Sequence, residues 1–201
     1  IGNEEVTNGD FSQIGSELVT NGDFVTDSNW GKGDGWTIAN GVASCDGTQT
    51  SGTQLTQTGL TFTNTKTYKV TYTVTVSAGN IDARLQGSGA TVTGTSRTSS
   101  GTYTDYLVST GNTSFRMRGN DAFIGTVDNV SVKEVGQDWE FTDGATITNN
   151  GVRIVSDGTY QRVKQDNVLT VGKQYKIQYE IVEKNSGNLK LANSFGLLTI
   201  P

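Results

Sequence analysis

Histidine is absent from the 201 residues of this chain, and cysteine, proline and methionine occur once each. Without histidine, the chain cannot build a Ser-His-Asp triad, a Cys-His pair or a histidine-ligated metal site from its own residues. A single cysteine, Cys45, cannot form an intrachain disulfide, and it lies in an alternating stretch that suits a small buried residue. These shortages exclude the commonest hydrolytic and zinc chemistries.

Positive charge is also scarce, with 15 Lys and Arg against 20 Asp and Glu and a net charge of −5. Nucleic-acid binding depends on clustered Lys and Arg that neutralise phosphates, so we expect no nucleic-acid partner and no role at a membrane surface. No apolar run approaches the ~20 residues of a membrane span, and we expect no membrane insertion. The first residue is Ile rather than Met, which indicates a processed chain or a fragment and leaves targeting open.

The acidic residues do not suggest an active site. Catalysis by paired carboxylates needs two acids that face each other across a cleft. Here the acids fall mostly in turns, and none lies in an apolar setting that would raise its pKa. We therefore expect the protein not to be an enzyme.

Glycine is abundant, with 26 residues, and Thr, Asn, Ser and Val are frequent, whereas long runs of helix formers are lacking. Short strands joined by Gly, Asn and Asp turns are favoured by this composition. The sequence predicts an all-β fold with almost no helix.

One motif occurs twice near the start of the chain. Glu17 to Phe24 reads ELVTNGDF, and Glu5 to Phe11 reads EVTNGDF. Gly permits positive φ and Asn and Asp tolerate it, so each copy predicts a strand edge, a tight turn and a Phe that anchors the chain in a core.

Alternating patterns predict the strands that follow. Trp36 to Cys45 predicts a hairpin with its turn at Asn40-Gly41. Residues 68–76 alternate strictly, and 81–86, 103–108, 114–118 and 127–135 give further strands. The expected core contains Tyr68, Tyr72, Val74, Ile81, Leu85, Phe115, Met117 and Val130.

The pattern restarts after Gly136. Lys66 to Tyr72, KTYKVTY, returns as Lys173 to Tyr179, KQYKIQY, which is a shift of 107 residues (175 − 68). This period is too long for a solenoid of small units and indicates tandem domains. We expect a leading strand and linker at 1–16, a complete domain at 17–135 and a second, partial repeat at 137–201.

These motifs resemble a known family. The order of Glu17 to Phe24, then Gly35-Trp36-Thr37, then Tyr68 to Tyr72 and finally Val127 to Glu134 resembles the carbohydrate-binding-module-like jelly rolls repeated in bacteriophage tail fibres and virion surface proteins. It is also similar to modules of secreted cellulases and xylanases. The resemblance implies tandem antiparallel β-sandwich domains of the jelly-roll, galactose-binding-like type, in which the first strand, from Glu17, lies beside the last.

Candidate sugar contacts are of two kinds. Trp30, Trp36 and Trp139 have faces that could stack on a pyranose; Trp36 fits a core position better, and Trp30 and Trp139 fit either role, as do Tyr103 and Tyr106. The outward positions of two strands give a hydrogen-bonding set for sugar hydroxyls or carboxylates. With Trp30, the predicted carbohydrate-binding residues are Arg84, Gln86, Arg116 and Arg118; the alternative is a solvated sheet face.

The resemblance also implies a possible structural calcium. Asp128 matches the closing position of the family's site, but Val25 stands where the family carries an acid. Asp23 and Asp46 could substitute as oxygen ligands, although Asp-Gly pairs form turns without metal.

The leading functional hypothesis is a structural and adhesive module of a phage virion that presents jelly rolls outward and touches host glycans. The alternatives are a carbohydrate-binding module of a secreted bacterial enzyme or adhesin, and a subunit of an extracellular filament joined by strand exchange. All place the chain on a virion surface or outside the cell, with virion or filament subunits and a homo-oligomer as partners. The second repeat lacks counterparts of 103–135, and 4–11 form an opening strand with no domain of their own, so we expect more chain after Pro201 or strand donation between subunits, and a stable first domain beside a weak second one.

Overall fold

A computed structural model describes residues 2–142, 144–148, 151–193 and 196–199. Every regular element in these ranges is a β-strand, as the composition predicts. The chain divides into two compact units, Ile1–Val168 and Leu169–Pro201. No described helix is long and apolar enough to span a membrane.

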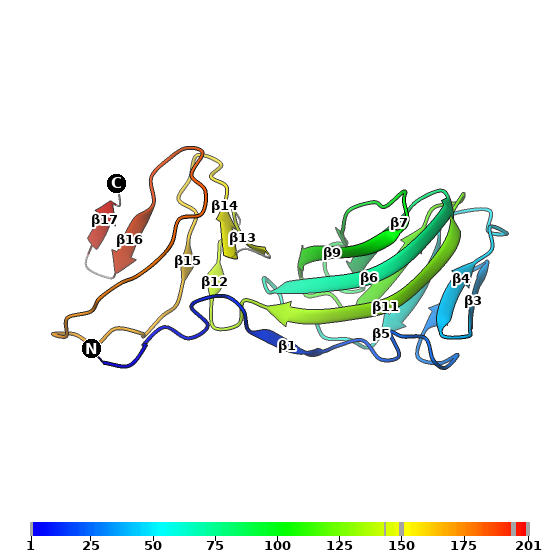
Figure 1. The fold of residues 1–201 in the computed structure, drawn as a ribbon, viewed down its shortest axis with the longest axis horizontal. Helices are drawn as coiled ribbons and strands as arrows, with labels where there is room; N and C mark the ends of the chain where they lie inside the picture. The colour runs from blue at the N-terminus through cyan, green and yellow to red at the C-terminus, as the bar shows by residue number, and fades with distance from the viewer. Residues whose placement is uncertain (1, 143, 149–150, 194–195, 200–201) are drawn as a thin grey trace. The chain divides into compact units, whose positions relative to one another are not determined.

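Residues 14–135 of the first unit form a sandwich of two antiparallel sheets (Figure 1). The larger sheet is centred on β11 (Ile124–Val135) and β6 (Thr67–Ala78), the two longest strands. Its other strands are β3 (Trp36–Ala39) and β4 (Val42–Cys45) on one side and β9 (Gly101–Val108) on the other, with β1 (Ile14–Glu17) also pairing with β11.

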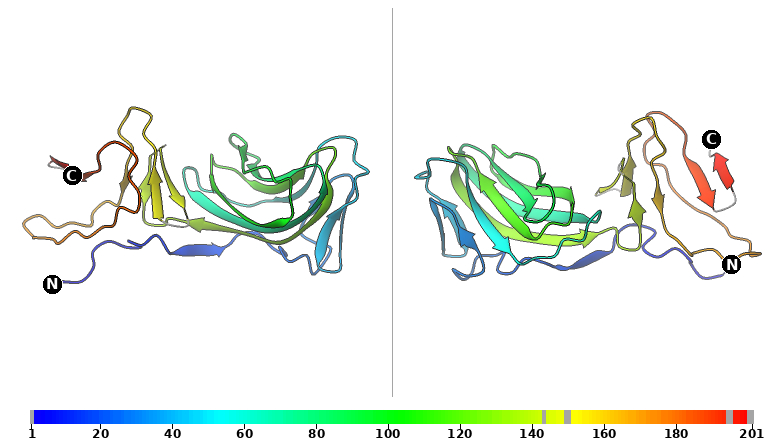
Figure 2. Two further views of the ribbon diagram at one scale, coloured as in Figure 1. Left: turned by 45° about the horizontal axis from the view of Figure 1, so that its top comes forward. Right: turned by 180° about the vertical axis from the view of Figure 1, so that it is seen from behind.

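The second sheet runs in the order β2-β5-β10-β7-β8. Its strands are β2 (Gly31–Lys32), β5 (Thr53–Thr58), β10 (Ser114–Gly119), β7 (Ile81–Gln86) and β8 (Val92–Thr93). Successive strands from β4 to β7 alternate between the two sheets, and so do β9, β10 and β11. Figure 2 shows the two curved layers from two sides. This sandwich confirms the predicted fold class.

The first strand lies beside the last, as expected. Ile14 pairs with Val135, and Val130 N donates a 2.8 Å hydrogen bond to Gly22 O. The strand begins at Ile14 rather than at Glu17. A Cβ at Gly22 would lie 2.0 Å from Val130 O, so this close approach of two backbones requires glycine.

The hairpin β3-β4 turns at Asn40 and Gly41, whose φ values are +55° and +74°. Positive φ at both central residues is the requirement of a type I′ turn, whose twist matches that of the flanking strands. The Asn-Gly pair therefore sets the register that places Trp36 and Cys45 opposite each other.

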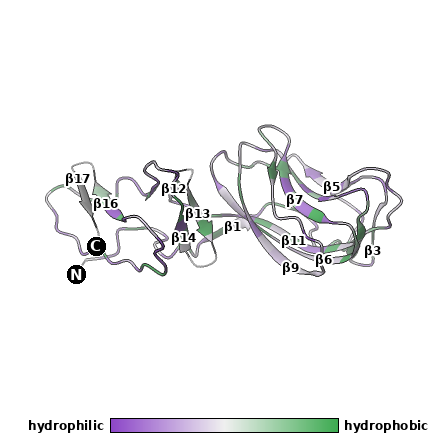
Figure 3. Cartoon of the chain, turned by 90° about the horizontal axis from the view of Figure 1, so that it is seen from above, coloured by the Kyte–Doolittle hydropathy of each residue, from purple (hydrophilic) through white to green (hydrophobic). Residues whose placement is uncertain are grey.

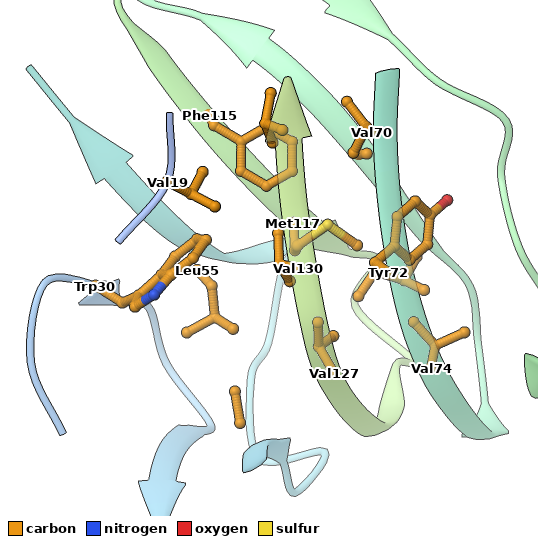
Figure 4. Close-up of a cluster of buried hydrophobic side chains, with 14 of the residues drawn as sticks. Val19, Trp30, Leu55, Val70, Tyr72, Val74, Phe115, Met117, Val127 and Val130 are labelled. Atoms are coloured by element: carbon orange, nitrogen blue, oxygen red, sulfur yellow. The ribbon is translucent and has the colours of Figure 1, made fainter. Parts of the chain in front are cut away.

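All eight expected core residues are buried, and Tyr72 and Phe115 are fully so. Figure 4 shows several of them meeting between the sheets, together with Trp30, Leu55 and Val127. Trp36 and Cys45 are buried as well, which confirms both expectations. Along β7, hydrophilic and hydrophobic residues interchange (Figure 3), because Leu85 points into the core and Arg84 points away from it. The alternation read from the sequence is thus the alternation of core and outer faces.

The second repeat reproduces two of the small strand pairings of the first. β12 (Glu140–Phe141) pairs with β15 (Val163–Lys164), as β2 pairs with β5, and β13 (Ala145–Thr148) pairs with β14 (Gly151–Ile154), as β3 pairs with β4. In unit two, β16 (Lys190–Asn193) pairs with β17 (Gly196–Thr199). The compact units do not divide at the sequence repeat near 136, and the predicted domain bounds remain a prediction.

The strand-like pattern at 174–182 forms no described strand. Tyr179, the counterpart of buried Tyr72, is 48 % exposed. In the first repeat, β6 is held between β11 and β9, and the described residues of the second repeat contain no counterpart of either neighbour. Alternation alone therefore does not make a strand here, because a ladder needs partners.

Candidate functional site

The outer face of the second sheet gathers the arginines that the sequence singled out. On β10, Arg116 stands opposite Arg84 of β7 and Thr56 of β5. Arg118 stands opposite Asp82 and Gln54 in the same ladders. Directly opposed residues point to the same side of a sheet, so the three guanidinium groups share one face.

Arg84 is fixed and neutralised on this face. Its Nε and Nη2 both donate to the carboxylate of Asp82, the second at 3.0 Å, and the Asp82 side chain is only 7 % exposed. The hydrogen bond to Asp82 raises the pKa of Arg84. Arg116 and Arg118 form no ion pair with any residue that the structure describes. Positive charge is therefore left at the centre of the sheet.

Three polar atoms on this face are buried without a hydrogen-bond partner among the described residues: Gln86 Oε1, Ser114 Oγ and Arg116 Nε. Ser114 and Gln86 are directly opposed, and Arg116 is the next outer residue along β10. Gln86 Nε2 donates 3.0 Å to Thr91 Oγ1, which fixes the amide with its oxygen unpaired. Buried polar groups are nearly always paired, so three unpaired atoms at adjacent positions set this part of the sheet apart.

A polar hollow of about 220 Å³ lies at the β5 edge of this face. It is lined by Gly33, Asp34, Ser51, Gly52, Thr53 and Gln54. A Cβ at Gly52 would fall 2.2 Å from Arg118 Nη2, so the guanidinium lies against the bare backbone of this loop. The face and the hollow therefore adjoin at Arg118.

Trp30 does not belong to the face, which corrects one expectation. Its side chain is in the core, 6 % exposed, and packs on Phe24 and Phe115 with ring centroids 5.3 and 6.2 Å away. Its Nε1 donates 2.9 Å to Asn21 O, because the loop that carries it folds back over the turn of the motif. None of the outward positions on β5, β7 and β10 is aromatic, so this face offers hydrogen bonds and charge rather than a stacking platform.

The three candidate calcium ligands have other contacts. Asp46 Oδ1 accepts from the N and Oγ1 of Thr48, which lowers the pKa of Asp46, and Asp128 accepts from the N and Nδ2 of Asn129. Asp23 is exposed in its turn. Within the described ranges, no group of three or more Cys, Asp or Glu is placed to hold a metal. A structural calcium stays a prediction.

A buried polar network inside the sandwich was missed from the sequence. Asp105 on β9 accepts hydrogen bonds from Tyr72 Oη at 2.8 Å and from Arg97 Nη2 at 2.6 Å. Arg97 comes from the connection 87–101, and its guanidinium lies 4.4 Å from the ring centroid of Tyr103. The signal was Asp105 itself, an acid at an inward position between Tyr103 and Leu107.

Comparison with known proteins gives little beyond this geometry. No family model and no curated protein sequence matches the chain. Two solved structures resemble 53 % of it with a TM-score of 0.41: a chain described as "CBM4 structure and function", at 15 % identity over 94 % of its length, and the N-terminal cellulose-binding domain of Cellulomonas fimi β-1,4-glucanase C, at 17 % identity over 88 % of its length.

Proposed function

We propose that this chain is a non-catalytic glycan-binding module whose first repeat binds carboxylate-bearing sugars on the outer face of β5, β10 and β7. The observation that supports it is the run of unpaired buried atoms at Gln86, Ser114 and Arg116 beside two arginines without ion-pair partners among the described residues. A guanidinium fork matches a carboxylate in two parallel hydrogen bonds, which suits the outward-facing Arg116 and Arg118.

The absence of an aromatic ring at these positions narrows the ligand class. Neutral glucans are bound largely by aromatic side chains that stack on the apolar faces of the sugar rings. Among the described residues, the outer face of this sheet has no aromatic side chain to do so. An acidic and hydrated glycan suits it better, because fixed positive charge and unpaired polar atoms are what the face provides. The net charge of −5 means that this attraction is local to the sheet.

In this proposal the setting is the surface of a phage virion, on a tail fibre or decoration protein, where tandem jelly rolls present glycan sites outward. Other virion or filament subunits, including further copies of the chain, are the expected protein partners, and a bound calcium would be structural. Immunogold labelling of purified particles with an antibody against this chain tests the setting. Label on no virion part would overturn it while leaving glycan binding intact.

The binding proposal is tested on a glycan array that pairs acidic oligosaccharides with neutral ones, using the 201-residue chain. Arg116→Ala with Arg118→Ala removes the free charge but keeps the Asp82–Arg84 pair, and should weaken acidic-glycan binding by about tenfold or more, since hydrogen bonds between charged groups contribute about 1.5–3 kcal/mol.

The matched control is Arg153→Ala with Arg162→Ala, which removes two exposed arginines from the second repeat. It should leave binding unchanged. Equal losses in the two double variants would reduce the effect to net charge, and binding of no acidic glycan would overturn the proposal.

A further inference from the structure

The two copies of the Thr-Asn-Gly-Asp-Phe motif fold into the same turn. Asn8 and Phe11 have φ values of +51° and +56°, and Asn21 and Phe24 have +54° and +51°. In each copy the Phe N donates to the Asn O, at 3.1 and 3.3 Å. A bulky residue with positive φ is uncommon, so a matching pair of phenylalanines indicates that each turn is held by specific contacts.

The second copy obtains those contacts from its own repeat. Asn21 O accepts 2.9 Å from Trp30 Nε1, and the Phe24 and Trp30 ring centroids lie 5.3 Å apart. Gln57 closes the motif with two hydrogen bonds: its Oε1 accepts from Thr20 N at 2.8 Å and its Nε2 donates to Thr20 O at 2.9 Å. These residues are close in the chain or belong to the next strands of the first sandwich.

The first copy makes the same contacts with residues that follow the first sandwich in the sequence. Asn8 O accepts 2.9 Å from Trp139 Nε1, and the Phe11 and Trp139 ring centroids lie 5.0 Å apart. Gln165 Oε1 accepts from Thr7 N at 2.9 Å, and Gln165 Nε2 donates to Thr7 O at 3.0 Å. The partners are 131 and 158 residues away in sequence.

The partners are equivalent by position as well as by chemistry. Trp139 follows Trp30 by 109 residues (139 − 30), which is also the offset between the first strands of the hairpins β3-β4 and β13-β14 (145 − 36). Gln165 follows Gln57 by 108 (165 − 57). In addition, Asn8 Nδ2 donates to Gln137 O, two residues before Trp139, as Asn21 Nδ2 donates to the carbonyl two residues before Trp30.

We propose that residues 5–11 are the opening segment of the second repeat, so that the first sandwich, with its linkers at 12–136, is inserted between this segment and the remainder of the domain that it opens. The Trp139 and Gln165 surface is thus a docking site whose occupant is the N-terminal segment of the same chain. This replaces the expectation that 4–11 form a strand with no domain of their own; the segment is a turn in the structure. The inference does not rest on glycan binding.

Two matched variants test the insertion in the intact chain. Phe11→Ala should lower amide-exchange protection at 137–142 and 144–148 by about tenfold or more, as removal of an anchoring aromatic predicts, and leave β6 and the burial of Cys45 unchanged. Phe24→Ala should lower the protection of β6 and expose Cys45 to alkylation, and it should leave protection at 137–142 and 144–148 unchanged. If the two variants affect the same region, or if Phe11→Ala affects none, the proposal is wrong.

A second copy of the chain is the rival occupant, because one protomer's segment could dock on another's Trp139. Amide-exchange protection at 137–142 and 144–148 is measured over a dilution series, and sedimentation reports the mass of the protein at each concentration. The two measurements together distinguish docking within one chain from docking between two copies. Protection that persists in a monomer supports docking within one chain. Protection lost on dissociation overturns it. A chain lacking residues 1–11, in which an added peptide of residues 3–13 restores protection at 137–142 and 144–148, confirms the site should Phe11→Ala fail to fold.

Discussion

Tyr72 donates a 2.8 Å hydrogen bond to Asp105 inside the sandwich, where the two residues are 0 % and 6 % exposed. The bond joins the central strand β6 to the edge strand β9 on their inward faces. Arg97 donates to both partners, at 3.3 Å to Tyr72 Oη and 2.6 Å to Asp105 Oδ1. A connection without a clear sequence pattern is thereby fastened to the core.

Replacing Tyr72 with Phe should lower the free energy of unfolding by about 1–3 kcal/mol, because a buried carboxylate loses one of its donors. Urea unfolding followed by tryptophan fluorescence measures it. Tyr103→Phe is the control: its hydroxyl donates 2.8 Å to Ser99 O at an exposed position, and its loss should be smaller. Equal losses would contradict the importance given to burial.

The same side chain predicts a loss of stability in alkali. Burial raises the pKa of Tyr72 far above its ordinary value, and the neighbouring Asp105 charge acts in the same direction. The unfolded chain releases this proton near pH 10, whereas the folded chain retains it, so the contribution is complete below about pH 10 and falls as pH rises toward the folded pKa. The difference between wild type and Tyr72→Phe should therefore shrink above pH 10. A difference that is constant to pH 11 would refute the shift.

Gly52→Ala should displace Arg118 without unfolding the domain. The added Cβ would meet the far end of a flexible side chain, which can move, so the melting temperature should change little while acidic-glycan binding weakens. Gly31→Ala is the control on the same sheet, because its Cβ would meet only Thr56 O at an ordinary 3.6 Å. Binding that survives Gly52→Ala would remove Arg118 from the site.

Cys45 should be inert to thiol reagents until the first sandwich opens. It is 3 % exposed, its Sγ donates 3.3 Å to Gln49 Oε1, and burial raises the pKa of the thiol, so little reactive thiolate forms. Alkylation timed over a denaturant series should follow global unfolding of this domain. Rapid labelling in native buffer would show local opening at β4.

Much of the first sandwich could be predicted from sequence because most of its strands carry their own signal. β7 was predicted with its observed bounds, since Ile81, Ala83 and Leu85 alternate with polar residues between two turn signals. The cross-strand pairing of Arg116 with Arg84 required one further step, that the two strands share a sheet. Local periodicity determines which face of a strand a side chain occupies. Which strand lies alongside is known only from the structure, which pairs β10 with β7.

The failures have a common physical cause, which is contact between residues distant in the chain. Trp30 lies in a polar loop, and its burial depends on packing against Phe115, which is 85 residues further along the chain (115 − 30). Thr7 gives no sign that Gln165 will close on it. Residues 174–182 alternate as 68–76 do, yet no described strand forms, since a pattern records what a strand would bury and not whether partners are present.

The pairing of Ile14 with Val135 has a consequence for how such a domain can spread among genes. The two ends of this domain leave it side by side. The two attachment points that it needs in a host chain are therefore no further apart than the ends of a short surface turn. Inserting it there lengthens the host's sequence greatly but spans almost no distance, and the entropic cost of closing a loop grows only slowly with its length. Such a domain can be inserted into another protein wherever that protein has a turn on its surface.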